Sequence, residues 1–483
     1  MAARGLPASC GGTFAITLTL ILAYVAAQIA LAVWANRGAT SDADYLLAGR
    51  RLGSVAVGMS LFATWFASET LLATSSEVAA NGLAGARAEP FAYAAGILCI
   101  ALFVAARLRR GGFFTIADFL RTRYDPRTEV LSAVVIALAA VTWSGAQLYA
   151  FAALIDTASG LGFGPSLVAA ALLVTVYTML GGLAGDVVTD MVQGAMLVAA
   201  MLLIFWLMLE ASGGPLAAWQ AIPPEALRLT VPGEHWSERL ELWLIPVVGT
   251  LVSQEALART LAARSPEVAR RGAFLGAGVY LAAGLIPVSF GLVGPQLVHL
   301  VGPDAAAMGE AFLPTLAQGL LPPWLTIVFT GALISAILSS VNSALMAASA
   351  VATESGYRRW RPAAEGPELL RAARGATVLA SLVAALLAAG GESLRSLVLD
   401  AEAISAVLAV PLVAALVGIR ASGRAASAAI CVQLAATVVL DRWLGVPGAF
   451  LWVVSAGLAS FALVGWLDRP RPAPAPPLGA EEA

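Results

Sequence analysis

The fold of this chain is decided by the segment SVAVGMSLFATWFASETLLATSSEVAA, residues 54–80. The segment is apolar and longer than the roughly 20 residues that a helix needs to cross a lipid bilayer. Its middle nevertheless carries a group of polar side chains, which are Ser60, Thr64, Ser68, Glu69 and Thr70. At membrane depth such groups must be paired or must line a cavity. We therefore predict a transmembrane helix that is interrupted at its polar middle and borders a binding site.

A second segment of this kind opens the other half of the chain, with the sequence LELWLIPVVGTLVSQEALA at residues 240–258. It contains two helix breakers, Pro246 and Gly249, which are followed by Ser253 and Gln254. Two polar or interrupted helices, one at the start of each half, are typical of transporters built from inverted repeats. We expect these repeats to cover residues 54–209 and 240–417.

The composition agrees with a membrane protein, since 59% of the 483 residues are hydrophobic and 12% are charged. A soluble domain has roughly a quarter charged residues. We predict an all-α integral membrane protein with a single transmembrane domain over residues 1–467 and a disordered cytoplasmic tail over 468–483. Apolar windows predict thirteen transmembrane helices, at 14–35, 54–80, 89–108, 130–156, 164–180, 187–209, 240–257, 272–296, 323–352, 374–390, 394–417, 424–441 and 446–467.

The basic residues, all of them Arg, are distributed unevenly over the predicted loops. One set of alternating loops contains 22 of the 28, and the other set contains 6. Because cytoplasmic loops are rich in positive charge, this asymmetry predicts a multi-pass protein of a bacterial-type inner (plasma) membrane. The N-terminus is expected outside the cell and the C-terminus in the cytoplasm. The smaller set is Arg4, Arg87, Arg228, Arg239, Arg395 and Arg442.

The chain lacks the residues that several functional classes require. The three Cys are scattered, so neither a disulfide framework nor a zinc site is indicated. His235 and His299 are the only histidines, and both fall in predicted external loops, so an intramembrane enzyme is disfavoured. No basic run with interleaved aromatics points to nucleic acid. The expected partners are a small solute and the lipid bilayer, and the oligomeric state stays open.

The motifs of the chain resemble those of the sodium:solute symporter family, whose members carry proline, sugars, pantothenate, iodide and other solutes. The resemblance implies a LeuT-like fold with a core of five plus five helices in inverted repeats. It rests on VYTMLGGLAGDVVTDMVQGAMLV (176–198), GALISAILSSVNSALMAASA (331–350), SLFATWFASETLLATSSEVAANGLAG (60–85), SQEALARTLAARSPEVARRGA (253–273) and ADFLRTRY (117–124). The fourth motif departs from the family pattern, because Ser253 replaces an Asn and Ala258 replaces a Gln.

The first motif combines a turn with acidic residues. Gly181 and Gly182 permit a tight hairpin between two spans, and Asp186 suits the start of the helix that follows. Asp190 and Gln193 then lie on one face of that helix. The resemblance implies that Asp190 lies near the cytoplasmic exit path of the ion.

The resemblance also implies a binding site for Na⁺, which would be the coupling ion. Side-chain oxygens would come from Ser339 and Ser340, and backbone carbonyls from Ala336, Ala63 and Phe66. Oxygen ligands without thiolate or imidazole suit a hard cation such as Na⁺.

The solute pocket is expected beside the interrupted helices, with Glu402 as a further candidate. A sugar is disfavoured, because Gly249, Pro246 and Thr70 stand where sugar-carrying members place their pocket residues. Two carboxylates and two Trp favour an amine or an amino acid, although simple packing accounts equally well for the Trp residues. The predicted solute-binding residues are Thr64, Trp65, Glu69, Thr70, Glu89, Trp143, Gln147 and Gln254.

We therefore expect a transporter, not an enzyme, that imports a small polar organic solute on a sodium gradient by alternating access. Two alternatives remain at this point. A symporter of the same fold could be driven by protons, with Glu69 or Asp190 titrating. A transporter-like sensor would need a separate signalling partner.

Overall fold

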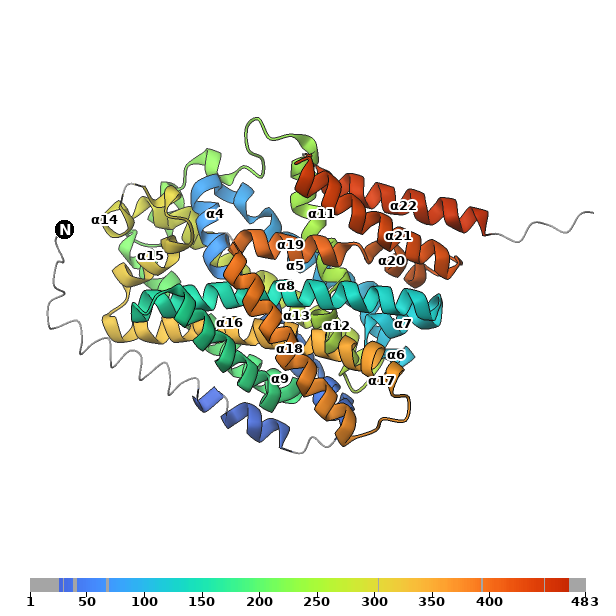
Figure 1. Ribbon diagram of the computed structural model, residues 1–483. Helices are drawn as coiled ribbons and strands as arrows, with labels where there is room; N and C mark the ends of the chain where they lie inside the picture. Colours follow the sequence, from blue (N-terminus) through green and yellow to red (C-terminus); the bar gives the residue numbers. More distant parts are fainter. Residues whose placement is uncertain are drawn as a thin grey trace, which may run out of the picture.

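The computed structural model describes residues 26–468, except 29, 38–40, 67–68, 303, 392–393 and 447 (Figure 1). This described part is built from helices, and its only β pairing is an isolated bridge between Leu52 and Ala263. The predicted all-α class is therefore confirmed. Most of the first predicted span, 14–35, and nearly all of the predicted tail, 468–483, lie outside the described residues.

Among the described residues, eight helical segments are long and apolar enough to cross a membrane, or up to ten if each of two bent helix pairs is one span. The predicted number of thirteen stays a prediction. The eight segments are Thr70–Gly111, Pro126–Asp156, Phe163–Ala211, Pro266–Gln296, Pro323–Trp360, Pro367–Gly390, Gly423–Leu440 and Ala449–Leu467.

The helices follow one another along the chain with short connections. The longer ones are α8 (Pro126–Ser159), α9 (Phe163–Ala211), α11 (Trp236–Val252), α13 (Pro266–Val293), α16 (Pro323–Val351), α18 (Pro367–Gly390) and α22 (Ala449–Leu467). The shorter ones are α2 (Asp42–Leu47), α3 (Ser54–Trp65), α4 (Thr74–Asn81), α5 (Tyr93–Cys99), α6 (Ala105–Gly111), α7 (Ile116–Arg123), α10 (Pro215–Ala221), α12 (Gln254–Leu261), α14 (Val298–Val301), α15 (Phe312–Leu320), α17 (Arg358–Trp360), α19 (Leu394–Ala406), α20 (Ala409–Val417) and α21 (Gly423–Ala436). Short π-helical turns include η2 (Glu69–Ala73), η4 (Arg87–Ala92) and η10 (Ala352–Tyr357).

The first interrupted helix breaks where its polar residues predict. Helix α3 ends at Trp65, and Phe66 leaves the helical region with φ −86° and ψ 66°. The chain resumes as η2 and continues into α4. The Thr70 hydroxyl donates to the carbonyl oxygen of Trp65 at 2.9 Å, so a side chain satisfies one group that the break leaves without a helical partner.

The second interrupted helix breaks later than Pro246 and Gly249 suggest, because both residues lie inside α11. The break falls at Ser253, where α11 and α12 meet at an angle of 44°. The Ser253 side chain accepts a hydrogen bond from the backbone N–H of Ala256 and so caps α12. A third bend, of 41°, separates α19 from α20 within the span predicted at 394–417, and no sequence signal anticipates it.

Helix α9 joins the two spans predicted at 164–180 and 187–209. A straight helix of its 49 residues would be roughly 74 Å long, far more than a bilayer requires. Gly182 interrupts it with φ 54° and ψ −172°. A Cβ atom there would meet the Tyr45 ring at 2.7 Å, so both the conformation and the close approach require glycine. The predicted turn at this glycine is confirmed.

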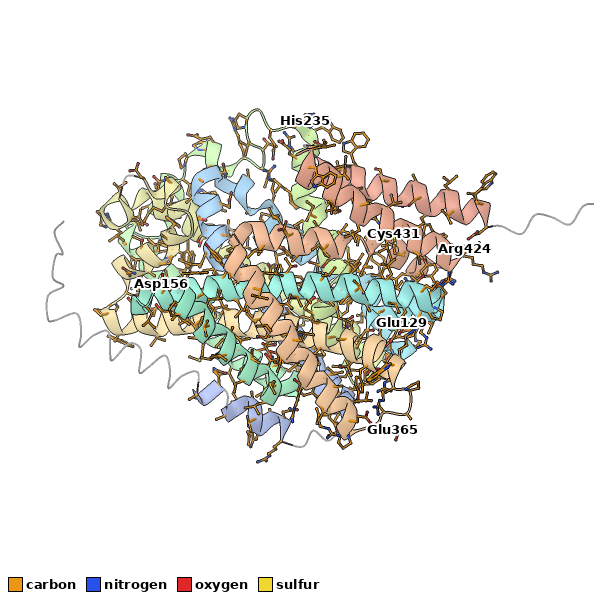
Figure 2. The ribbon with its side chains drawn as sticks, viewed as in Figure 1. Glu129, Asp156, His235, Glu365, Arg424 and Cys431 are labelled. Atoms are coloured by element: carbon orange, nitrogen blue, oxygen red, sulfur yellow. The ribbon has the colours of Figure 1, made fainter. Side chains whose placement is uncertain are left out.

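Helix α3 lies in the interior of the bundle. Helix α3 packs against α13 and α9, and α16 packs against α8 and α9. Helix α8 spans the bundle, with Glu129 and Asp156 near its two ends (Figure 2). Leu52, just before α3, pairs with the segment just after α12, since its N–H donates to Ala262 at 3.2 Å and its carbonyl accepts from Arg264 at 3.0 Å. The two interrupted helices are thus fastened together at one end.

Candidate functional site

A small cavity lies beside the break of α3 and brings together four of the five predicted sodium ligands. Its lining includes Ala63 and Phe66 from the break, and Ala336 and Ser339 from α16. Helix α9 contributes Gln193 to the same lining. We call this space the ion cavity. The residues that the resemblance associates with Na⁺ are therefore neighbours, although they come from distant parts of the chain.

The fifth predicted ligand, Ser340, faces the other way. Its hydroxyl donates to the carbonyl oxygen of Thr64 at 3.1 Å, and it lines a different cavity. The Ser339 hydroxyl instead donates to Asp190. The adjacent serines of α16 thus bond to different helices, Ser339 to Asp190 of α9 and Ser340 to Thr64 of α3.

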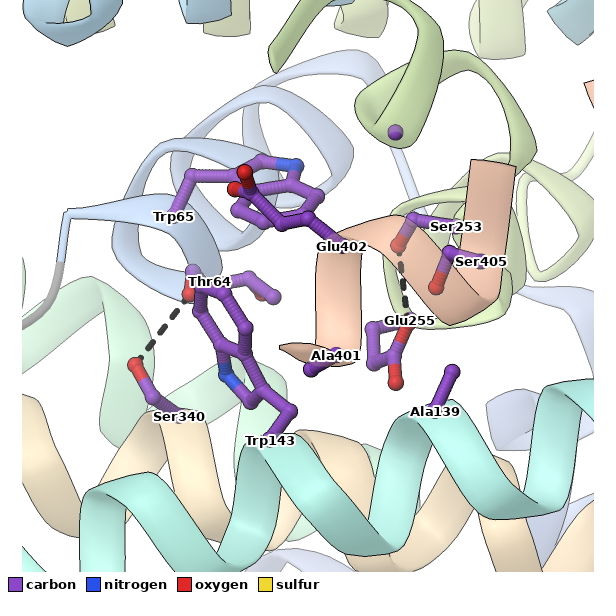
Figure 3. A pocket seen from close by; sticks show the side chains of 11 residues that line it. Thr64, Trp65, Ala139, Trp143, Ser253, Glu255, Ser340, Ala401, Glu402 and Ser405 are labelled. Atoms are coloured by element: carbon purple, nitrogen blue, oxygen red, sulfur yellow. Dashed lines mark hydrogen bonds between the residues drawn. The ribbon is translucent and has the colours of Figure 1, made fainter. Parts of the chain in front are cut away.

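The second cavity, which we call the solute cavity, includes three of the predicted solute-binding residues (Figure 3). Trp65 and Trp143 approach each other edge to face, with ring centroids 5.5 Å apart. Glu402 reaches the cavity from α19, between the aromatic side chains and the second interrupted helix. The lining is Thr64, Trp65, Ala139, Trp143, Gly249, Ser253, Glu255, Ser340, Ala401, Glu402 and Ser405.

One hydrogen-bond donor in this lining has no partner. The hydroxyl hydrogens of Thr64, Ser253 and Ser340 are all donated to oxygens of the protein. The indole Nε1–H of Trp65 is buried without a hydrogen-bond partner. Such a group costs about 1–3 kcal/mol if nothing satisfies it. A solute with an acceptor atom would remove this cost.

A larger cavity of about 320 Å³ lies next to the solute cavity, and Glu402 lines both. It contains Glu89, whose carboxylate accepts a hydrogen bond of 3.3 Å from Thr74. Glu77 and Glu241 also line this larger cavity, with Arg87 as the one basic residue of the lining. Arg87 is paired with Glu234 at 2.7 Å. The larger cavity therefore has more acidic than basic side chains in its lining, which favours a cationic group over an anion.

Of the remaining predicted solute residues, Thr70, Gln147 and Gln254 lie elsewhere. Thr70 bonds to the backbone of Trp65 and lies 3.2 Å from the Tyr280 hydroxyl. Gln147 is buried on α8 outside the described linings, and Gln254 accepts a bond of 2.8 Å from the N–H of Ile116. The Glu69 side chain is not among the described ones. The solute contacts predicted for these four residues remain predictions.

A buried ionic cluster adjoins the ion cavity and was not anticipated as a unit. Asp186, Asp190 and Arg259 are completely buried. Arg259 forms an ion pair with Asp186, and its guanidinium lies 3.8 Å from Asp190. Asp186 follows the kink in α9, as expected of a helix start, but it binds Arg259 and Asn342 instead of facing solvent.

The signals for this cluster were present in the sequence but separated. Ser60 belongs to the polar stripe of α3, and its hydroxyl donates to Asp190 at 2.5 Å. Ser343 belongs to the second sequence motif, residues 331–350 on α16, and receives a hydrogen bond from Arg259. Arg259 lies within the fourth sequence motif, but its side-chain partners Asp186 and Ser60 are 73 and 199 positions away, so the motif alone could not identify them.

The bundle of membrane-spanning helices, the interrupted helices and the buried cavities at the breaks define a membrane transporter. The family model described as the sodium:solute symporter family matches residues 45–426. This match covers most of the chain, and the chain therefore belongs to that family.

Similar proteins carry different solutes. The chain is 26% identical to the high-affinity choline transporter 1 of Torpedo marmorata, over 65% of this chain and 55% of that protein. It thus spans little more than half the length of that relative. It is 25% identical to the sodium/proline symporter of Escherichia coli, over 78% of this chain and 77% of that one.

A solved structure of a Na⁺-coupled sialic acid symporter has the same fold. Its TM-score is 0.81, its sequence is 19% identical, and the superposition covers 95% of this chain and 98% of that one. At this identity the likeness shows the fold alone.

Proposed function

We propose that the protein is a sodium-coupled symporter that imports a small zwitterionic organic solute, such as an amino acid, across the plasma membrane. Family membership supports sodium as the coupling ion and transport as the activity. The N-terminus would lie outside and the C-terminus in the cytoplasm, as the arginine asymmetry indicates.

One observation carries this proposal: the ion cavity and the solute cavity share the break of α3. Ala63 and Phe66 line the first, and Thr64 and Trp65 line the second. Four consecutive residues at one irregular turn therefore line both cavities. A cation held in the ion cavity would fix the backbone that shapes the solute cavity. The cation would then bind more tightly to the conformation in which the solute cavity is formed, and such a difference in affinity is what coupling requires.

In the proposed cycle, Na⁺ enters first and bridges α3 and α16. Backbone oxygens at Ala63, Phe66 and Ala336 and the hydroxyl of Ser339 would hold it, and the Ser340 hydroxyl would join them by turning away from the carbonyl of Thr64. Bridging these helices would order the turn at Trp65 and so prepare the solute cavity. Asp190, which accepts a hydrogen bond from Ser339, lies where the ion would leave.

The chemistry of the solute cavity favours a zwitterion. The Trp65 and Trp143 rings and the Glu402 carboxylate suit a cationic nitrogen. The unpartnered Trp65 N–H requires an acceptor, which a carboxylate supplies. Choline and proline, after which two similar proteins are named, both contain a positively charged nitrogen.

The first experiment needs no known solute. The thermal stability of the purified protein is measured in sodium against potassium at equal ionic strength. Sodium at about 100 times its dissociation constant should stabilise the protein by roughly 2.7 kcal/mol. The increment should disappear in the double variant Ser339→Ala with Ser340→Ala.

Solutes are then screened in the presence of sodium, with uptake into proteoliposomes as the readout. Absence of any difference between sodium and potassium for the folded protein would contradict sodium coupling. Uptake that followed a proton gradient would then identify a proton-driven symporter. Retained sodium binding without uptake of any solute would point to a sensor.

A further inference from the structure

The side-chain amide of Gln193 stands out among the buried polar groups of the membrane domain. Gln193 is 3% exposed, and neither its amide oxygen nor its amide nitrogen has a hydrogen-bond partner. Buried amides are normally paired, so two unpartnered atoms on one side chain require an explanation. The side chain lines the ion cavity, opposite the break of α3.

The surroundings of this amide favour a cation over another ligand. The Ser339 hydroxyl hydrogen is donated to Asp190, so toward the ion cavity Ser339 can offer only the lone pairs of its oxygen. The remaining lining consists of Phe62, Ala63, Phe66, Gly194, Leu197 and Ala336, which offer no side-chain donor. A completely buried carboxylate, Asp190, lies one turn before Gln193 on α9.

We propose that the side-chain oxygen of Gln193 is a ligand of the coupling sodium ion. This inference rests on the proposed function, since it concerns the same ion. An amide oxygen is a suitable ligand for a hard cation, and rotation of the amide can present the oxygen to the ion. The sodium site then joins three helices, α3, α16 and α9, instead of two.

The third helix changes what sodium binding can do. Helix α9 also carries Asp186 and Asp190, which hold Arg259 of the second interrupted helix. A sodium ion bound to Gln193 therefore reaches both interrupted helices, one directly and the other through α9 and the ionic cluster.

The test is a sodium titration of thermal stability for the wild type and for Gln193→Leu, at constant ionic strength with potassium as the balancing ion. We expect the variant to need at least tenfold more sodium for the same increment. The stability of the variant in potassium should be equal to or higher than that of the wild type, because the variant no longer buries the unpartnered amide of Gln193. Binding of ²²Na⁺ to the purified proteins gives the same comparison without heating.

Two further variants keep the result interpretable. Gln193→Glu retains an oxygen and should retain the sodium increment, and Gln193→Met replaces Gln193→Leu if the latter does not fold. Gln433→Leu is the control, because Gln433 is also completely buried, but its amide donates to the carbonyl of Val407 at 2.9 Å far from the ion cavity. It should lower stability equally in sodium and in potassium.

The outcomes separate this inference from the proposed function. A sodium increment in the wild type that persists unchanged in both Gln193→Leu and Gln193→Met overturns the role of Gln193 and leaves the proposed function intact. Absence of an increment in the wild type overturns both.

Discussion

The two interrupted helices differ in how the backbone groups at their breaks are satisfied. At the break of α3, backbone groups are turned toward the two cavities, and partners from other helices reach them, such as Ser340. At the break of α11, the chain satisfies itself, since Ser253 caps α12 and also donates to Glu255 at 2.8 Å. We call the first break open, because its residues line both cavities, and the second break closed, because its Ser253 side chain is bonded within its own segment, although Ser253 also lines the solute cavity.

The closed break supports the open one. Arg259 of α12 reaches Ser60 of α3 at 3.3 Å while it is held by Asp186. The comparison teaches that one interrupted transmembrane helix can be shared by two cavities, whereas another is held at its bend by its own side chains and by ion pairs to a neighbouring helix.

The largest effect on stability is expected from Arg259→Met, which removes the anchor that Arg259 forms with Asp186 and Asp190. The change leaves Asp186 and Asp190 buried without their guanidinium, which should cost about 3–5 kcal/mol of folding free energy. The thermal unfolding midpoint and the yield of monodisperse protein measure it. Arg264→Met is the control, because Arg264 is exposed and should change stability by less than about 0.5 kcal/mol. Equal stability of the two variants would contradict the anchor.

Within the open break, Ser339→Ala and Ser340→Ala should separate the two cavities. Ser339 lines the ion cavity, so its loss should raise the sodium requirement about tenfold, or roughly 1.4 kcal/mol. Ser340 lines the solute cavity, so its loss should weaken sodium binding less and affect solute uptake more. Sodium titrations of stability and of uptake test this difference. Ser349→Ala is the control, since that buried hydroxyl bonds to Ala373 and its loss should leave the sodium requirement unchanged.

Removing the side-chain cap at the break of α11 with Ser253→Ala should have a smaller effect on stability. The lost helix cap should cost about 1 kcal/mol, which the thermal midpoint reports. Ser265→Ala removes a matching cap at the start of α13, where no break lies. Both variants should lose similar stability, but only Ser253→Ala should also change uptake. Identical uptake by the two variants would show that the cap at the bend is merely structural.

The smallest effect on stability is expected just before α11, where Glu234 pairs with Arg87. The hydrogen bond from Arg87 lowers the pKa of Glu234 below its ordinary value. Because this pKa is lower in the folded state, the pair stabilises the protein above the ordinary glutamate pKa of about 4.3 and stops doing so as the pH falls through the folded-state pKa.

Glu234→Gln should therefore destabilise by up to about 1 kcal/mol at pH 7, and by less as the pH approaches 4. Thermal midpoints at the two pH values measure this. Glu225→Gln, at an exposed position of the same loop, should have no such dependence. A penalty for Glu234→Gln that grew toward acidic pH would contradict the assignment.

Much of the fold could be predicted because its signals are local. The polar middle of residues 54–80 predicted the break of α3, and the glycine pair predicted the turn in α9. The second break was placed too early, because Pro246 is tolerated inside α11 while a serine with good capping geometry ends it. The bend between α19 and α20 had no local signal at all.

The candidate site was predicted less completely. Trp65 and Trp143 were expected in one pocket and line one cavity, whereas Gln254 binds the backbone of Ile116, so its predicted solute contact stays a prediction. A polar residue near a break can face the ligand or a neighbouring segment, and helical spacing alone does not distinguish the two.

The sequence by itself determined that this chain crosses a membrane many times and interrupts its helices at polar residues, because segment length, hydropathy and helix breakers act within one helix. Only the tertiary structure decided that Ser339 and Ser340 serve opposite cavities and that Gln193 joins the ion cavity. These outcomes depend on how helices from distant parts of the chain pack, and packing selects which face of each helix meets which neighbour.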